Sequence, residues 1–398
     1  MPELVALDLP GGMGFVDALR AIWDTGDAAA PLDPRLPGTA RRTMLEALRP
    51  TRIVGSDGEQ HALPGGVPVD DGDALVVATS GTSGTSGQPK GVVLTHDAVS
   101  SSARATSEHL GVDPGRHTWL ACLPLAHIGG LAVVTRALVT GTPLVVMPGF
   151  EAEAVELAGR SGRVTHVSLV TTALGRLDPA VFTCVLLGGS KSPVSLPPNV
   201  VSTYGLTETG SGVVYDGVAL DGVELAVQRG DGTYSAAGAG VGAGGGTAED
   251  GEILVRAAML LRCYRDGADG RVVGPDGQRS WFATGDAGHF DAHGKLVVSG
   301  RIDDVITTGA EKVWPDVVER VLRAHPGVTE VAVWKRSDPE WGERVVAWIV
   351  PADDIPSLDD LRQLVAETIA PWAAPKELVI VDDLPRTASG KVRRRALS

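Results

Sequence analysis

The chain has 398 residues, of which 43% are apolar, and carries 49 acidic against 35 basic side chains, a formal net charge of −14. A chain of this length can bury the cores of two or three domains, whereas its acidity argues against a nucleic-acid or anionic-membrane surface as partner. No stretch combines a basic start with an apolar core, and the most apolar region is broken by an arginine and turn formers. We therefore expect a cytoplasmic protein with no signal peptide and no membrane span.

The cysteines point to the same compartment. Cys122, Cys184 and Cys263 are widely separated, odd in number and without a CxxC pair. Such spacing suits neither a disulfide framework nor a structural zinc site. We expect reduced thiols in a reducing compartment.

The first clear pair of strands encloses a polar loop. Ala74–Ala78 and Val92–Leu94 are apolar runs that predict strands, and a helix is expected to begin near His96. A Ser/Thr/Gly linker is the alternative interpretation of the loop between them. Linkers rarely join two apolar strands, so we favour a ligand-binding loop.

That loop is the most informative part of the sequence. It extends from Thr79 to Gly91, and its central residues are Thr82, Ser83, Gly84, Thr85, Ser86 and Gly87. Glycines let backbone N–H groups turn toward an anion, hydroxyls add hydrogen bonds, and Lys90 supplies a mobile positive charge. The run is not a Walker A loop, because Pro89 and Gly91 flank the lysine. It predicts a binding site for a nucleoside triphosphate.

Short strands and helical stretches continue to alternate beyond this loop. Further predicted strands are Val167–Val170 and Val185–Leu187. This pattern is typical of an α/β protein. We predict a large domain over residues 1–302, in which the Ala/Gly-rich run Ala236–Gly251 forms a surface loop between strands.

A second polar run, Tyr204–Gly210, follows an apolar segment and is expected at a strand end, where open α/β sheets bind ligands. Tyr204 can stack on a base, Thr207 can bond a phosphate, and Glu208 can hold Mg²⁺ through oxygen. Taken alone, the run is equally compatible with a strand-to-loop turn that carries a solvated glutamate.

The pattern from residue 303 onward predicts a small α+β domain, residues 303–398. Its expected helices are Val317–Ala324, with Pro315 in the first turn, and Ser357–Ile369, capped by Ser357 and stopped by Pro371. Its expected strands are Val328–Trp334, Val345–Val350 and Leu378–Val381.

An ordered set of motifs resembles the adenylate-forming superfamily of acyl-CoA synthetases, luciferases and peptide-synthetase adenylation domains. Besides the two polar runs, the motifs are Pro124–His127, Leu187–Ser190, Thr284–Asp286, Gly300–Asp304 and Pro385–Lys391. The resemblance implies a large multi-sheet N-terminal domain and a small mobile C-terminal lid. It also implies a two-step reaction: a carboxylate attacks the α-phosphorus of ATP and expels pyrophosphate, and a thiol, here coenzyme A, then captures the acyl-adenylate.

The resemblance assigns most of the ATP site to the middle of the chain. Beyond the Thr82–Gly87 loop and Lys90, its members are Gly188, Gly189, Ser190, Tyr204, Gly205, Thr207 and Glu208. By the same resemblance Tyr204 stacks on adenine, Thr207 contacts the α-phosphate and Glu208 holds Mg²⁺. Asp286 would accept the ribose hydroxyls and Arg301 would bond ribose or phosphate. A surface ion pair, worth about 0–1 kcal/mol, is the alternative for these last two residues.

The C-terminal residues are expected to serve both half-reactions. The resemblance makes Lys391 the catalytic lysine between the carboxylate and the α-phosphate, against the alternative of an exposed lysine in a basic tail. It makes Asp303 the hinge about which the small domain swings after adenylation. Gly309 and Ala310 would then line the pantetheine tunnel. Ala310 stands where the family often has a second glycine, so its methyl group is expected to narrow that tunnel.

The acid is expected near His127, the segment Leu186–Lys191 and the stretch after Glu208. The part of the chain before the phosphate loop is shorter than in most family members. This short N-terminal part and the motif Leu123–Leu131 resemble bacterial o-succinylbenzoate–CoA ligases of menaquinone biosynthesis. The second carboxylate of o-succinylbenzoate needs a partner, for which His127 and Lys191 are candidates; a histidine satisfied by a backbone carbonyl is the alternative for His127.

Three other functions stay open from the sequence. One is another aryl- or acyl-CoA ligase, the second a freestanding adenylation domain that loads a carrier protein, and the third a catalytically dead nucleotide-binding paralogue. The expected partners are a small carboxylate, ATP and coenzyme A, with a homodimer allowed and nucleic acid excluded by the charge.

Overall fold

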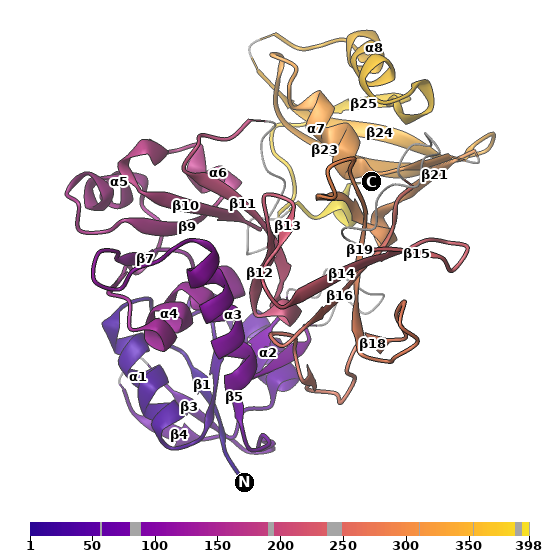
Figure 1. Ribbon diagram of the computed structural model, residues 1–398. Helices are drawn as coiled ribbons and strands as arrows, with labels where there is room; N and C mark the ends of the chain where they lie inside the picture. The colour runs from indigo at the N-terminus through magenta and orange to yellow at the C-terminus, as the bar shows by residue number, and fades with distance from the viewer. Residues whose placement is uncertain are drawn as a thin grey trace. The chain divides into compact units, whose positions relative to one another are not determined.

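The computed structural model describes residues 1–398 except 56–57, 80–88, 190–194, 237–248, 310, 353, 387–391 and 398. The chain forms two compact units (Figure 1). The first comprises Met1–Ala226 and Leu254–Thr284, and the second Val227–Ile253 and Gly285–Ser398. The sequence analysis divided the chain into a large domain, residues 1–302, and a mobile small domain, residues 303–398. That division stays a prediction. No helix in the described part of the chain is long and apolar enough to cross a membrane.

The first unit contains two seven-stranded sheets. The first sheet has the order β17-β6-β5-β2-β1-β3-β4. Its strands are β1 (Leu4–Leu7), β2 (Ala28–Pro31), β3 (Arg52–Val54), β4 (Gln60–Ala62), β5 (Asp73–Ala78), β6 (Gly91–Thr95) and β17 (Cys263–Tyr264). Strands β5 and β6 are antiparallel, and Thr79 N donates to Lys90 O at 2.8 Å. The predicted strand–loop–strand arrangement around residues 79–91 is therefore confirmed at both ends of the loop.

The second sheet has the order β13-β12-β11-β10-β9-β7-β8. Its strands are β7 (Trp119–Ala121), β8 (Leu144–Val146), β9 (His166–Val170), β10 (Cys184–Gly188), β11 (Val200–Leu206), β12 (Ser211–Tyr215) and β13 (Val218–Ala219). The five neighbouring strands β8, β7, β9, β10 and β11 are parallel, while β12 and β13 are antiparallel additions. Parallel strands buried on both faces are rich in Val and Leu, as this sequence is.

Six α-helices are described in the first unit: α1 (Met13–Asp24), α2 (Gly38–Leu48), α3 (His96–His109), α4 (Ile128–Thr140), α5 (Ala152–Arg160) and α6 (Thr171–Leu174). Helix α3 begins as predicted, because the Thr95 hydroxyl accepts from Ala98 N at 3.1 Å and caps it. Helix α4 packs against α3 and over the second sheet (Figure 1). Gly130 lets the first turn of α4 lie against the loop that precedes it, because a Cβ there would lie 2.5 Å from the carbonyl oxygen of Pro124.

Short 3₁₀ turns complete the helical elements of the described chain. They are η1 (Pro179–Val181), η2 (Thr207–Thr209), η3 (Ile302–Asp304), η4 (Pro371–Ala373) and η5 (Arg394–Ala396).

A six-stranded sheet has the order β15-β14-β16-β19-β18, with β20 paired to β19. Its strands are β14 (Val223–Gln228), β15 (Tyr234–Ala236), β16 (Gly251–Ala257), β18 (Arg271–Val272), β19 (Trp281–Phe290) and β20 (Leu296–Arg301). Of the predicted loop Ala236–Gly251, residues 237–248 lie outside the described residues. Its two ends already belong to strands β15 and β16, so the described chain agrees with a connection between strands.

The C-terminal part of the second unit is a five-stranded sheet with two helices. The order is β22-β21-β24-β23, and β25 pairs with β24. Its elements are β21 (Ile306–Thr308), β22 (Glu311–Val313), α7 (Pro315–Leu322), β23 (Val328–Asp338), β24 (Gly342–Pro351), α8 (Leu358–Thr368) and β25 (Glu377–Ile380). The predicted helices and strands of this part are confirmed, with Ser357 capping α8 through Asp360 N at 3.1 Å. The pattern missed the β21–β22 hairpin and the polar ends of β23 and β24.

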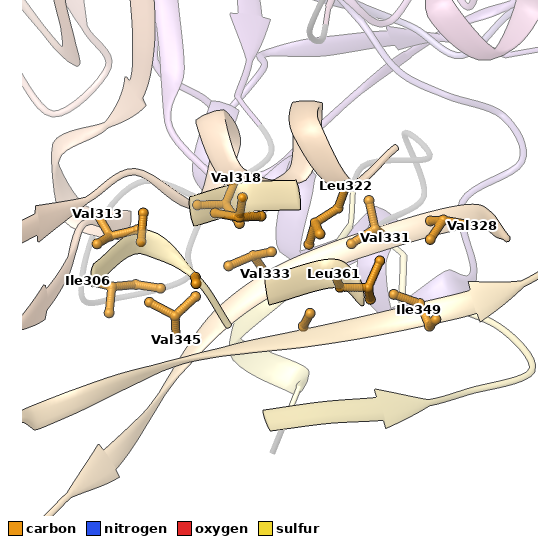
Figure 2. Close-up of a cluster of buried hydrophobic side chains, with 14 residues drawn as sticks. Ile306, Val313, Val318, Leu322, Val328, Val331, Val333, Val345, Ile349 and Leu361 are labelled. Carbon is orange, nitrogen blue, oxygen red and sulfur yellow. The ribbon is translucent and has the colours of Figure 1, made fainter. Parts of the chain in front are cut away.

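Aliphatic side chains from α7, α8 and the sheet form the core of this part (Figure 2). Val318 and Leu322 of α7 and Leu361 of α8 meet Val333 and Ile349 of the central strands, and all five are almost fully buried. Burial of such side chains is worth about 1.5–3 kcal/mol each, which makes this core the main source of local stability.

We expect Leu361→Ala to destabilise this part of the chain by about 2–5 kcal/mol, because Leu361 is 0% exposed and its loss leaves a cavity. Hydrogen exchange of the β23 and β24 amides in the full chain measures the effect. The matched control is Ile355→Ala, at a side chain that is 63% exposed, with an expected change within about 0.5 kcal/mol. Equal exchange rates in both variants would contradict this assignment of the core.

Candidate functional site

The first group of site residues lies where β11 of the first unit ends. Strand β11 continues through Leu206, so Tyr204 and Gly205 belong to the strand rather than follow it, and the turn η2 holds Thr207 and Glu208. The hydroxyl of Thr209 accepts from Leu206 N at 2.8 Å and lies 2.7 Å from Ser211 O. These bonds fix the turn, so the predicted strand-end position is confirmed for Thr207 and Glu208.

Gly205 is required by the close approach of two strands. The register of β11 and β12 shifts between Tyr204 and Gly205, and a Cβ on Gly205 would lie 2.1 Å from Ser211 O. No side chain fits in that space. The glycine therefore lets the strand bulge beside the half-buried Tyr204.

Glu208 is held by residues distant in sequence. Tyr264 donates its hydroxyl hydrogen to Glu208 Oε1 at 2.9 Å, and Leu261 N donates to Glu208 O at 2.7 Å. The Lys90 ammonium lies 5.1 Å from the centroid of the Tyr264 ring, within cation–π range. One phenol thus connects the predicted phosphate-loop lysine to the predicted Mg²⁺ ligand.

Strand β17, which carries Tyr264, is anchored on both sides. Arg262 donates to both oxygens of the buried Asp73 carboxylate, at 2.8 and 2.7 Å. Arg265 donates to the carbonyl oxygens of Leu48 and Val67 at 3.0 and 2.8 Å. Bidentate pairing to a buried carboxylate is geometrically specific, so it holds Tyr264 in place. Sequence reasoning missed Tyr264, since no local motif marks it and only the pairing of β17 with β6 brings it here.

The Glu208 carboxylate is suited to bind a Mg²⁺ ion that is also bound by the phosphates of a nucleotide. Among the described residues no group of three or more His, Cys, Asp or Glu side chains could hold a metal by itself. Mg²⁺ is commonly held by one or two carboxylates together with water and substrate phosphates. A carboxylate has about four acceptor positions, and the Tyr264 bond uses one of them. The donor set therefore fits a cation that arrives with a nucleotide.

Gly188 and Gly189 lie at the same edge of the second sheet as Tyr204. Strands β9, β10 and β11 are parallel, so their carboxyl ends meet there, as ligand sites of open α/β sheets require. Gly189 has φ +84°, a conformation that side chains rarely adopt. The chain thereby turns away from the strand immediately before Ser190.

Several predicted residues fall outside the described residues. These are Thr82, Ser83, Gly84, Thr85, Ser86, Gly87, Ser190, Lys191, Ala310 and Lys391. Their assigned roles stay predictions. Lys90, by contrast, is described and exposed beside Tyr264.

Asp286 and Arg301, both in the second unit, are brought together by the β19–β20 pairing. Arg301 Nη1 donates to Asp286 Oδ1 at 3.0 Å, and the two residues face each other in the register. The ion pair considered as the alternative is therefore formed, with the Asp286 side chain 9% and the Arg301 side chain 30% exposed, and the roles of both residues at the ribose stay predictions. A Cβ on Gly285, which has φ +68°, would lie 2.9 Å from Arg301 Nη2. Glycine at 285 thus lets the guanidinium pack beside Asp286.

The predicted hinge and tunnel residues lie further along the second unit. Asp303 is exposed in the turn η3. Gly309 has φ +65°, and its N donates to Trp341 O at 2.8 Å. Both positions are accessible turns, and their assigned roles stay predictions.

Arg394 argues against the alternative of an exposed basic tail around Lys391. Its guanidinium donates to Asp304 at 2.8 Å and to Glu319 at 2.9 Å, and it also contacts Asp316. Burial lowers the pKa of Arg394, but the charges of Glu319, Asp316 and Asp304 outweigh it and raise that pKa. The segment that follows Lys391 is thus tied to α7 and η3, a contact the sequence pattern did not indicate.

His127 occupies the position immediately before α4. It is half-buried, and its backbone accepts the first bonds of the helix from Gly130 N and Leu131 N, both at 3.0 Å. The N-terminus of α4 therefore carries the predicted acid-site histidine, whose proposed contact with the acid stays a prediction.

Comparison with known proteins extends the motif resemblance over most of the chain. The family model "AMP-binding enzyme" matches residues 82–265, and "AMP-binding enzyme C-terminal domain" matches residues 317–391. A probable 2-succinylbenzoate–CoA ligase of Mycobacterium tuberculosis H37Rv is 37% identical over 90% of this chain and 95% of its own length. The 2-succinylbenzoate–CoA ligase of Listeria monocytogenes EGD-e is 34% identical over 79% of this chain and 68% of its own.

Solved structures agree with this relationship. The o-succinylbenzoate CoA synthetase of Bacillus subtilis, in complex with the acyl-adenylate intermediate, superposes with a TM-score of 0.83 at 27% identity, covering 100% of this chain and 88% of that one. The same enzyme in complex with ATP and magnesium ion gives a TM-score of 0.83 over 99% of this chain and 89% of that one. The predicted α/β fold, with its large N-terminal and smaller C-terminal parts, is thus confirmed. The chain belongs to the AMP-binding enzyme family, the adenylate-forming superfamily that its ordered motifs resemble.

Proposed function

We propose that the chain is a 2-succinylbenzoate–CoA ligase. It uses ATP and Mg²⁺ to adenylate 2-succinylbenzoate and transfers the acyl group to coenzyme A, releasing AMP and pyrophosphate. The observation that carries the proposal is the 37% identity to the Mycobacterium tuberculosis relative, which spans 90% of this chain and 95% of that protein. The Bacillus subtilis enzyme bound to its acyl-adenylate supports the same substrate. A role in menaquinone biosynthesis, a cytoplasmic location and a homodimer remain part of the proposal.

The first half-reaction moves negative charge onto phosphate oxygens. A carboxylate oxygen attacks the α-phosphorus of ATP, and the bond to the bridging oxygen breaks to release pyrophosphate. Mg²⁺ bound with the nucleotide neutralises charge on these oxygens. Glu208, oriented by the hydroxyl of Tyr264, would hold that ion, and Thr207 would bond the α-phosphate. The loop from Thr79 to Gly91 would bind the departing β- and γ-phosphates.

The second half-reaction needs a different set of residues. The thiolate of coenzyme A attacks the acyl carbon and AMP leaves. In the proposal Lys391 serves only adenylation, and rotation about Asp303 then brings Gly309 and Ala310 to the pantetheine tunnel. Asp286 and Arg301 would hold the ribose through both steps.

Pyrophosphate release against a panel of carboxylic acids tests the substrate. We expect release to depend on 2-succinylbenzoate and ATP, with a coenzyme A thioester of matching mass. No response to this acid, alongside turnover of a fatty or simple aryl acid, would overturn the proposal. Adenylation without transfer to coenzyme A would favour loading of a carrier protein, and ATP binding without turnover of any acid would favour a dead paralogue.

Lys391→Ala is expected to lower acid-dependent pyrophosphate release by about 10²–10³-fold, because it removes a preorganised donor to the α-phosphate. Thioester formation from supplied acyl-adenylate should be largely retained. The control is Arg393→Ala, an exposed cation two residues away, which should change neither rate. Equal loss in both half-reactions would refute the role given to Lys391.

Tyr264→Phe is expected to raise the Mg²⁺ concentration needed for half-maximal adenylation by about 10-fold, because Glu208 loses the hydrogen bond that orients it. Glu208→Gln should cost more, about 10²-fold in rate at saturating Mg²⁺. Tyr234→Phe, on strand β15, is the matched control and should leave the Mg²⁺ titration unchanged. A Tyr264→Phe titration that coincides with that of the unmodified chain would remove Tyr264 from the site.

A further inference from the structure

A cavity apart from the proposed active site opens at the C-terminal end of α2. Its volume is about 330 Å³, at the lower end of the range found for small-molecule pockets. One wall comes from α2, with Leu45 and Arg49, and the other from the segment that follows β4, with Leu63 and Pro64. The cavity therefore belongs entirely to the first unit.

Close backbone packing fixes the shape of this cavity. Val67 N donates to Arg49 O at 2.9 Å. A Cβ on Gly66 would lie 2.4 Å from the carbonyl oxygen of Pro50, so only glycine fits at this contact. These contacts hold the two walls together through the backbone. The cavity is thus a feature of the chain path and does not depend on the placement of one side chain.

The lining of the cavity carries an excess of positive charge. Arg42 and Arg49 lie seven positions apart, about two helical turns, and both side chains are exposed. Neither guanidinium makes a hydrogen bond or an ion pair with another described residue. Glu46 lines the cavity as well, so two cations stand against one carboxylate and leave a charge of +1. In a chain of net charge −14, such a surface favours an anionic ligand.

A third arginine adds to this positive potential. Arg265 donates to three backbone carbonyl oxygens, at 3.0, 3.3 and 2.8 Å, and to no carboxylate among the described residues. Burial lowers the pKa of Arg265, and the charge of Arg49 lowers it further. Asp73 acts in the opposite direction, but its carboxylate is paired with Arg262. An anion bound at Arg49 would therefore offset a repulsion between two cations.

The backbone of Arg49 is also unusual. It ends α2 in the left-handed conformation, with φ 52° and ψ 53°, which glycine or asparagine ordinarily adopts at this position. A residue with a Cβ is strained there. Strained residues concentrate at ligand sites, where the side chain has a use that offsets the strain. The side chain of Arg49 lines the cavity.

We propose that this cavity is a second binding site, which takes a small aromatic carboxylate. A carboxylate matches the forked donors of Arg42 and Arg49, and planar guanidinium groups also stack on aromatic rings. Leu45, Leu63 and Pro64 supply the apolar lining that a ring needs. None of these residues is assigned to the adenylation site, so the second site does not depend on the proposed function.

Calorimetric titration of the full chain with 2-naphthoate tests the site. Arg49→Gly removes the guanidinium and suits φ 52°, so the Tm of this variant without ligand should be equal or higher. We expect Arg49→Gly to weaken binding of 2-naphthoate by about 10-fold, and Arg42→Gln combined with Arg49→Gly to weaken it by about 100-fold. The matched control is Arg20→Gln, at an exposed arginine of α1, which should leave the affinity unchanged.

Two further probes test the ligand class. Naphthalen-2-ylmethanol keeps the ring without the charge, and inorganic phosphate keeps the charge without the ring. Each should bind equally to the unmodified chain and to the double variant, since any binding in the active site is common to both. A loss of either probe in the double variant as large as that of 2-naphthoate would overturn the ligand class.

Two results would overturn the site itself. One is failure of the unmodified chain to bind 2-naphthoate, and the other is an affinity for 2-naphthoate that both Arg49→Gly and the double variant leave unchanged. Turnover of 2-succinylbenzoate is measured separately by pyrophosphate release, so failure of the proposed function is a distinct outcome.

Discussion

The hydrogen bonds that Glu208 makes to the segment around β17 join the two seven-stranded sheets of the first unit. Its carbonyl oxygen accepts from Leu261 N at 2.7 Å, and its carboxylate accepts from Tyr264 at 2.9 Å. Glu208 follows the last parallel strand of one sheet, while β17 is the edge strand of the other. The site residues of both sheets therefore keep one geometry, as a preorganised electrostatic site requires.

Three arginine environments show how the fold treats charge. Arg394 meets carboxylates from η3 and α7, and Arg301 meets Asp286 across a strand pair. In both cases carboxylates of the protein neutralise the charge of the guanidinium, so these contacts stabilise the local structure. In the described part of the chain, Arg136 donates one hydrogen bond, to the hydroxyl of Ser211, and makes a cation–π contact with Trp119.

Sequence reasoning succeeded where an element depends on interactions between residues close in sequence, and it failed where the partners are distant in sequence. Strands such as β5 and β10 and the capped helix α8 were predicted, because apolar periodicity and a capping serine act over a few residues. The polar ends of β23 and β24 and the β21–β22 hairpin were missed, since these residues pair with a neighbouring strand without an apolar pattern. The pairing of Arg394 was not foreseen because its three carboxylate partners lie 75 to 90 positions earlier in the chain.

By itself the sequence determined the chemistry of the family: glycines, hydroxyls and a lysine before Gly91, the Thr207–Glu208 pair, and the order of the remaining motifs. These signals are local, since each depends on residue types at short fixed spacing. Only the tertiary structure decided that Tyr264 orients Glu208, that Asp286 is buried against Arg301, and that two guanidinium nitrogens of the buried Arg136 have no hydrogen-bond partner among the described residues. Strand pairing and helix packing bring these groups together across long sequence separations, and whether a buried charge has a partner can be known only when that packing is complete.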